Sequence, residues 1–510
     1  MTTTLLRTVL RNSSSALILV ALLNLGMPAY AAGPKQAAPP AKPAPAARPA
    51  PAAKPAPATR PGAISSGTTT APGLSSAPSA NHSTANGPGA TTHPTAMGGV
   101  SSSTVPQRTT ASASRMPSST FQRPVPNGSR AIVGSNGNAM RMRQDGRPAE
   151  IHNVAHGMDI HHSLNGGSRV MVEHADHGRT VFERGRPGYV QRPYAFHGHD
   201  FARRTYFYHG REYSHFYHGY AYRGMYMNVY APAFYYRPGY YGWAYNPWDA
   251  PVTYQWGFTV SPWYGHYGYF YAPAPVYPTA SLWLADYMIS SDLQQAYAAH
   301  TEGGEADVAA PPAGSAPLLT PDVKQQIADE VRNQLALENQ EAQQNAAHQD
   351  INPGSSGIDR MLNDGRSHVY VVGTALDAED SAKNECLLSD GDVLSLQSPT
   401  PAGESTVNMV VLASKGGREC QIQAKVMVTL EDLQEMQNHM RESVDKGLQE
   451  LQAKQGKDGI PTAPAVAQGE PTPAQYAAIA PPEDPNAAAQ IHEQAQQADE
   501  VEKDVTAGQQ

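Results

Sequence analysis

Histidines are the residues of this 510-residue chain whose type and spacing first suggest chemistry. Twelve of the 19 lie between residues 152 and 266. They include the adjacent pair His161 and His162, and the pair His197 and His199 with one residue between them. Imidazoles two apart on a strand share a face and could bind Zn²⁺, Cu²⁺ or Ni²⁺. One hypothesis is therefore a weak metal site at these four histidines, in a periplasmic metal-binding protein.

A conformational explanation competes with metal binding. Five of the 12 histidines directly precede a glycine: His156, His177, His197, His209 and His218. Histidine is one of the non-glycine residues enriched at positive φ, and tight turns need such residues. Turn formation thus explains these five positions without a metal.

The motifs of enzymes are weak or missing in this chain. The string from His197 to Asp200 partially resembles the metal-binding motif of metallo-β-lactamase-type hydrolases, but Phe201 and Ala202 follow and the closing histidine is missing. We find no GxSxG motif and no glycine loop of the kind that binds phosphate. The chain is predicted to be non-enzymatic and to need no cofactor, with an enzyme of unrecognised type as an alternative.

Aromatic side chains and arginines are concentrated in the middle of the chain. Residues 189–277 hold 21 of the 26 tyrosines, four of the five tryptophans and seven of the nine phenylalanines. Residues 123–237 hold 15 arginines and no lysine, against eight acidic residues. Guanidinium groups stack on planar partners as well as forming ion pairs. The rings could form the core of a β repeat, a surface that stacks on sugars, or a surface for self-association.

For the two surface alternatives we predict a set of binding residues. The partners would be a polysaccharide or cell-wall polymer, or other copies of the chain. Single-stranded nucleic acid also suits arginine and aromatic side chains, but an exported protein is a poor match for it. The predicted set is Tyr206, Tyr208, Tyr213, Tyr217, Tyr220, Tyr222, Arg203, Arg204, Arg211, Trp243 and Trp248.

The first 31 residues have the pattern of a Sec signal peptide. Arg7 and Arg11 precede an apolar run at residues 16–23, and an A-x-A site places the cleavage between Ala31 and Ala32. The apolar run is too short to span a membrane. We expect a periplasmic, cell-surface or extracellular protein with no transmembrane span after cleavage.

Two low-complexity segments follow the predicted signal peptide. Residues 32–63 repeat a KPAPAA-like unit, which favours extended polyproline II and a stiff spacer. Its regularly spaced cations could alternatively follow an anionic envelope polymer. Residues 64–125 are rich in Ser, Thr and Gly and are expected to be a disordered linker.

The central region is predicted to be β structure. In residues 126–230 a glycine recurs every 9 to 12 residues between short alternating segments, which is typical of successive hairpins. Residues 231–300 contain many prolines, so we expect an irregular aromatic coat that ends in a helix. Together these features predict a mainly β fold with helical flanks and an antiparallel β meander.

The C-terminal part is predicted to contain a small domain between helices. After a linker at 301–319, a helix at 320–348 carries a narrow apolar line that needs a partner strip, in this chain or in a second copy. Residues 360–430 are expected to form a small β-domain with a Cys386–Cys420 disulfide, since exported cysteines pair. A helix at 431–455 and a disordered acidic tail at 456–510 complete the chain. The apolar line of the first helix is Val323, Ile327, Val331 and Leu335.

Five sequence segments carry a resemblance to other proteins. They are YYGWAYNPW (240–248), SPWYGHYGYF (261–270), YPTASLWLADYMI (277–289), ECLLSDGDVL (385–394) and LEDLQEMQNHMRE (430–442). With them the chain resembles a group of exported tyrosine-rich bacterial proteins that have no known activity. The resemblance implies export and a shared architecture, and it carries no catalytic residues.

Overall fold

The structure is a computed structural model that describes residues 125–303, 317–396 and 403–507. These residues belong to one unit of the chain. The predicted signal peptide with its Ala31–Ala32 cleavage site, the spacer and nearly all of the first linker lie outside the described residues, as does most of the linker at 301–319.

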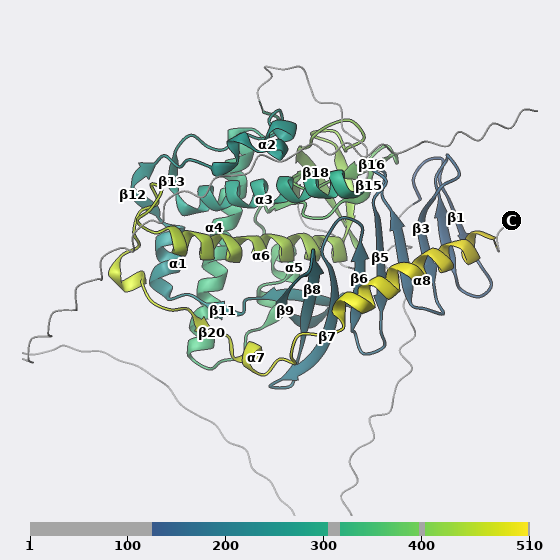
Figure 1. Ribbon diagram of the computed structural model, residues 1–510, viewed down its shortest axis with the longest axis horizontal. Coiled ribbons are helices and arrows are strands. Elements are labelled where there is room, and N and C mark those ends of the chain that lie inside the picture. The colour runs from purple at the N-terminus through teal and green to yellow at the C-terminus, as the bar shows by residue number, and fades with distance from the viewer. Residues whose placement is uncertain (1–124, 304–316, 397–402, 508–510) are drawn as a thin grey trace, which may run out of the picture. The chain divides into compact units, whose positions relative to one another are not determined.

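A ten-stranded antiparallel sheet forms the first part of the described chain, residues 130–231 (Figure 1). Its strands are paired in sequence order, so the predicted meander is confirmed. Turn residues explain the spacing: Gly146 after Asp145 and Gly198 after His197 both have positive φ, which glycine adopts without a side-chain clash. The strands are β1 (Arg130–Val133), β2 (Ala139–Met142), β3 (Pro148–Asn153), β4 (Met158–His162), β5 (Ser168–Glu173), β6 (Arg179–Glu183), β7 (Gly188–Phe196), β8 (His199–Tyr208), β9 (Arg211–Tyr222) and β10 (Met225–Ala231).

The two faces of this sheet differ sharply in chemistry. Residues directly opposite each other on neighbouring strands share a face. A row of apolar residues crosses the strands on one face, which we call the outer face. The neighbouring residues form a charged row on the opposite face, which we call the inner face. The outer row is Met140, Ile151, Ile160, Val170 and Phe182, and the inner row is Arg141, Glu150, His161, Arg169 and Glu183.

The C-terminal helix α8 (Ala487–Ala507) covers the outer face, where Figure 1 shows it crossing the strands. Ala498, Val501 and Val505 are buried against the apolar row. The prediction of a disordered tail at 456–510 is therefore wrong. The physical reason is that an Ala/Gln/Glu-rich segment with a thin apolar stripe folds once a sheet supplies the opposing surface.

The segment 231–300 is also more ordered than predicted, since its prolines begin helices and lie in short strands. Its rings point largely inward: Tyr240, Tyr271, Tyr277 and Trp283 are among the largest fully buried side chains. The expected irregular coat is thus an aromatic core. The elements are β11 (Phe234–Tyr235), α1 (Pro238–Tyr245), β12 (Pro247–Val252), η2 (Gly257–Val260), α2 (Pro262–Tyr267), β13 (Tyr277–Thr279) and α3 (Ala280–Gly303).

The small β-domain is a six-stranded sheet, with strand order β14-β17-β18-β19-β15-β16. The predicted disulfide is confirmed: Cys386 and Cys420 are joined, with Cα atoms 4.9 Å apart. The strands are β14 (Val369–Val371), β15 (Leu376–Asp380), β16 (Glu385–Leu388), β17 (Val393–Leu396), β18 (Thr406–Ala413) and β19 (Lys425–Thr429).

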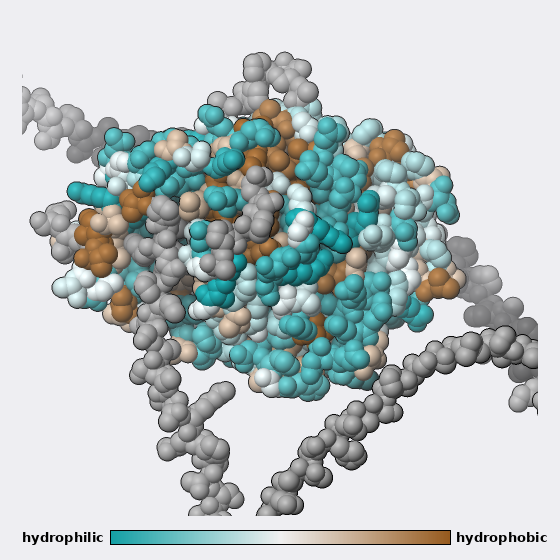
Figure 2. Space-filling view, turned by 180° about the vertical axis from the view of Figure 1, so that it is seen from behind, coloured by the Kyte–Doolittle hydropathy of each residue, from teal (hydrophilic) through white to brown (hydrophobic). Residues whose placement is uncertain are grey.

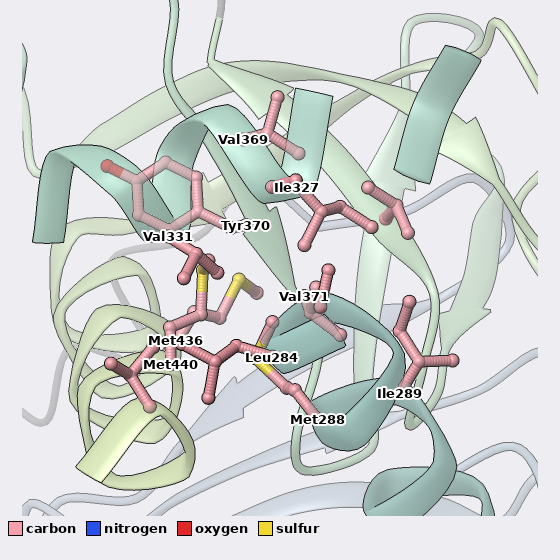
Figure 3. Close-up of a cluster of buried hydrophobic side chains, with 14 of the residues drawn as sticks. Leu284, Met288, Ile289, Ile327, Val331, Val369, Tyr370, Val371, Met436 and Met440 are labelled. Carbon is pink, nitrogen blue, oxygen red and sulfur yellow. The ribbon is translucent and has the colours of Figure 1, made fainter. Parts of the chain in front are cut away.

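Helices α3, α4 (Pro321–Ala346) and α6 (Leu430–Lys454) pack with this small sheet around the main core (Figure 3). Leu284, Met288 and Ile289 of α3 and Ile327 and Val331 of α4 belong to one buried cluster, as Figure 3 shows. The apolar line of α4 therefore has its partner within the chain. The remaining elements are η3 (Pro353–Ser355), α5 (Ile358–Asn363), η4 (Ala465–Ala467), β20 (Thr472–Pro473) and α7 (Gln475–Ala478).

The β10 edge of the large sheet is closed by a side chain of α6. The buried Asn438 amide accepts from the Tyr230 N–H at 2.8 Å and donates to the Asn228 carbonyl at 2.8 Å. The amide thus supplies both partners that a neighbouring strand would supply, and it ties α6 to the sheet.

We expect Asn438→Leu to destabilise the protein by about 2–3 kcal/mol, because it leaves a buried donor and a buried acceptor without partners. Chemical denaturation of the variant and the wild type measures this loss. Gln449→Leu, at an exposed position of the same helix, is the matched control and should change stability by less than about 0.5 kcal/mol. Equal stability of the two variants would show that the amide bridge contributes nothing.

Candidate functional site

A cleft of about 170 Å³ lies between the inner face of the large sheet and helices α3 and α6. We call it the inner cleft. The sheet and its β6–β7 connection contribute Arg169, Glu183, Arg186, Tyr189, Arg204, Tyr206 and Tyr213, and the helices contribute Tyr287, Asp292, Asp432, Glu435, His439, Glu442 and Lys446.

Strand register brings three tyrosines into one row beside this cleft. Tyr189 of β7 is opposite Tyr206 of β8, which is opposite Tyr213 of β9. The rings of Tyr206 and Tyr213 are stacked, with centroids 5.0 Å apart and planes 3° from parallel. Lys446 is exposed, and its Nζ lies 5.8 Å from the Tyr213 centroid. The row therefore ends at a half-buried ring that solvent reaches.

Arg204 forms the floor of the site two residues before Tyr206. Its guanidinium donates to both carboxylate oxygens of Glu435, at 2.8 and 3.0 Å. It also lies over the rings of Tyr217 and Tyr189, at 3.8 and 4.6 Å from their centroids. Burial alone would raise the pKa of the Glu435 carboxyl, but Arg204 outweighs that effect and lowers the pKa. The pair holds α6 at a set distance from the sheet.

The helix wall of the cleft carries two more pairs, each of an acidic side chain and a histidine. His439 Nε2 lies 2.8 Å from Asp292 of α3. Burial would lower the pKa of His439, but the Asp292 carboxylate outweighs it, so that the pKa is raised. Glu442 accepts a short hydrogen bond from the Tyr217 hydroxyl and lies 3.0 Å from Nδ1 of His215. The polar groups of the wall are thus held in place before any ligand binds.

Arg169 differs from the other arginines of the cleft. Its guanidinium makes no hydrogen bond or ion pair to any described residue, although it lies opposite Glu183 and His161 on neighbouring strands. Burial would lower the pKa of Arg169, but the field of Glu183 outweighs it and raises the pKa. The group stays charged with its donors available to a ligand in the cleft.

The remaining predicted binding residues do not form one surface. Arg204, Tyr217 and Trp248 are buried, which corrects their assignment to an exposed surface, because the first two bond to α6 and Trp248 packs in the main core. Arg203 faces away from the cleft and pairs with Glu483 at 2.9 Å. Tyr208, Tyr220, Tyr222 and Trp243 are half-buried and Arg211 is exposed, and none of these five lines the inner cleft.

The four histidines of the metal hypothesis are divided between several places. His161 lies 3.5 Å from Asp377, whereas its neighbour His162 lies 3.2 Å from Glu502 of α8, because adjacent residues of a strand point to opposite faces. His197 and His199 both approach Asp350, at 2.8 and 3.9 Å. Within the described ranges, no group of three or more His, Cys, Asp or Glu side chains is already placed to hold a metal ion.

The turn interpretation of the histidines is confirmed at four of the five positions: His156 lies in the turn before Gly157, and the other three also have positive φ. His177, His197 and His209 have φ of 67°, 49° and 49°. His218 instead lies inside β9.

A larger and more open cleft of about 1190 Å³ lies between the large sheet and the small sheet, and we call it the outer cleft. Its walls carry charges of both signs and Cys386 of the disulfide. Residues around it include Arg143, Arg147, Asn165, Glu385 and Arg418. Arg143 is bound to Asp377 and Glu385, and Arg418 donates to the Leu164 carbonyl, so these contacts join the two sheets.

None of the helices in the described part of the chain is long and apolar enough to cross a membrane. Comparison with protein family models, with curated proteins and with solved structures found no match to this chain.

Proposed function

We propose that this protein is an exported, non-catalytic envelope or secreted protein that binds a polysaccharide or cell-wall polymer through the inner cleft. The observation that carries the proposal is the convergence of the Tyr206–Tyr213 stack and the available Arg169 guanidinium on one preformed cleft. Tyrosine faces suit sugar rings, and fixed polar groups orient a bound ligand.

The charge balance of the inner cleft favours a neutral ligand. Five carboxylates line it, opposed by Arg169, Arg186, Arg204, Lys446 and the paired His439. A polyanion would meet these carboxylates, whereas the hydroxyl groups of a sugar can accept from arginine and donate to carboxylates. The cleft is smaller than the roughly 300–1,000 Å³ of drug-sized sites. We therefore infer that one sugar ring, or the end of a chain, enters it.

The predicted export of the chain supports the same conclusion independently of the cleft. The sequence begins with a signal-peptide pattern, and the only two cysteines form a disulfide, as expected in an oxidising compartment. Cell-wall and envelope polymers are the saccharides that such a compartment presents.

Titration of the mature chain with neutral oligosaccharides tests the proposal. We expect Tyr213→Ala and Arg169→Met each to weaken binding about tenfold, which corresponds to about 1.4 kcal/mol. Tyr245→Ala is the matched control, since Tyr245 is 40% exposed on α1 outside the cleft. Absence of saccharide binding, or an equal loss with Tyr245→Ala, would contradict the proposal, and concentration-dependent oligomers would favour self-association instead.

A further inference from the structure

A second group of donors lies on the face of β8 and β9 that points away from the inner cleft. His197 lies in the turn before β8, His199 begins β8, His218 lies in β9, and Asp350 follows α4. His199 is two residues from Phe201, which is opposite His218 in the strand pairing. Strand register and the chain after α4 thus bring three imidazoles and one carboxylate to one place.

The buried His218 is the observation that points to a ligand here. It is 4% exposed, and its Nε2 has no hydrogen-bond partner among the residues that the structure describes. Its ring is stacked on Phe201, with centroids 4.2 Å apart, and it lies edge-on to His199 at 5.6 Å. A buried polar atom without a partner is costly, and a neutral imidazole is the form that binds metals.

A small cavity of about 20 Å³ lies between these donors, lined by His199, His218 and Asp350. The space is sufficient for one water-sized particle or ion. His197 Nδ1 lies 2.8 Å from one oxygen of Asp350, and His199 Nε2 lies 3.9 Å from the other. These three side chains are about half exposed, so they can rotate toward the cavity.

We propose that His199, His218 and Asp350, with His197, form a binding site for one divalent transition metal ion such as Zn²⁺, Cu²⁺ or Ni²⁺. Imidazole nitrogens with one carboxylate oxygen are a ligand set that these ions favour. Binding requires the half-exposed side chains to turn, since the donors do not yet surround one point. The ion would supply the missing partner of His218 and would replace the His197–Asp350 contact. This site is independent of the proposed saccharide binding.

Calorimetry with Zn²⁺ on the mature chain without a histidine tag tests the site, and Co²⁺ absorption gives a second readout of imidazole ligation. We expect one ion per chain with a Kd of about 1 µM or tighter. His199→Ala and Asp350→Asn, at half-exposed positions where folding is not at risk, should each weaken binding at least about tenfold. His218→Phe, which keeps a ring on Phe201, should do the same.

His209→Ala is the matched control, because His209 is also a turn histidine with φ of 49° and a side chain that is 56% exposed. It should leave the Kd unchanged. A Kd weaker than about 1 mM, or an equal loss with His209→Ala, would overturn the proposal and leave only adventitious surface binding. Unchanged binding in His199→Ala and Asp350→Asn would overturn it as well.

Discussion

Replacing Arg441 with methionine is expected to destabilise the protein by about 3–5 kcal/mol at pH 8. Arg441 is completely buried between α4 and α6, where its Nη2 donates to Glu341 at 2.7 Å. Glu338 and Asp445 are buried beside this pair, and Tyr230 donates to Asp445 at 2.7 Å. Without the guanidinium, three carboxyl groups would remain in the core with no opposing charge, which is the costly way to break a buried ion pair.

The loss should depend on pH in a defined direction. Burial raises the pKa of Asp445 to about 6, against its ordinary value of 3.8, and burial together with Asp445 raises the pKa of Glu338. A carboxyl whose folded pKa is raised binds its proton more tightly in the folded state, so stability is greatest at low pH. That stability is lost as the pH rises from about 4 through about 6. The deficit of Arg441→Met should therefore be larger at pH 8 than at pH 5.

Urea denaturation at pH 5 and pH 8 measures both effects. Arg332→Met is the matched control, since Arg332 lies on α4 with a 30% exposed side chain and an exposed partner, Asp329, and should change stability by less than about 1 kcal/mol. Glu338→Gln, which imitates the protonated carboxyl, should flatten the pH dependence. A deficit that is the same at both pH values would contradict the buried-carboxylate explanation.

Removal of the disulfide should cost about 4 kcal/mol. The bond closes a loop with a sequence separation of 34 residues, and the chain-entropy relation for that length gives this value. The loop runs from β16, one of the two edge strands of the small sheet, through β17 and β18. Cys386→Ser with Cys420→Ser should lower the denaturation midpoint, and a reductant should do the same to the wild type.

Backbone contacts offer an alternative attachment of this loop. The Leu387 N–H donates to the Arg418 carbonyl, and the Cys420 N–H donates to the Leu387 carbonyl. If these bonds alone held the loop, the reductant would change the midpoint of the wild type hardly at all. The double variant supplies the control, because a reductant has no disulfide to act on there and should leave its midpoint unchanged.

Local patterns in the sequence were sufficient to predict the meander. Turn residues such as Gly146 mark where strands end, and the alternation within SRVMVEH (168–174) marks a strand. Both signals depend only on residues that are close together in the chain. At the start of α4 the Thr320 side chain accepts from the Val323 N–H, a contact that also depends only on near neighbours in the chain. The prediction of the disulfide needed only the count of two cysteines and the expectation that the chain is exported.

Long-range pairing explains what the sequence could not show. Arg204 and Tyr217 belong to an aromatic, arginine-rich run that suggests a surface, but their partners Glu435 and Glu442 lie more than 200 positions later. Nothing near these residues in the chain indicates that α6 covers them. The same is true of the residues of the proposed metal site, because Asp350 is 151 positions beyond His199 and carries no motif.

The wrong prediction of a disordered tail at 456–510 has a different origin. Ile491, Ala498, Val501 and Val505 lie on one side of α8, but alanine and glutamine around them give an average composition typical of disorder. Spacing at intervals of three, four and seven was a usable signal, whereas the composition of the whole segment was not. In the segment 231–300, proline density suggested irregular structure, yet Pro238 and Pro262 begin helices.

Hydrophobic patches on the face in Figure 2 are separate and surrounded by hydrophilic residues. This face therefore has no single large apolar surface for a partner, and the two clefts remain the candidate binding sites. The inner cleft carries tyrosine rings together with an available guanidinium, and the outer cleft is lined by charged and polar side chains and the disulfide. The two clefts can be distinguished experimentally because different segments line them.

Hydrogen–deuterium exchange of the mature chain, with and without a saturating neutral oligosaccharide, tests the inner cleft most directly. Bound saccharide should slow exchange in the segments 204–213 and 435–446, which carry its tyrosines and its helix wall. It should leave the segments 163–167 and 417–424, which border the outer cleft, unchanged. Protection of the outer-cleft segments, or no protection at any saccharide concentration, would contradict saccharide binding at the inner cleft.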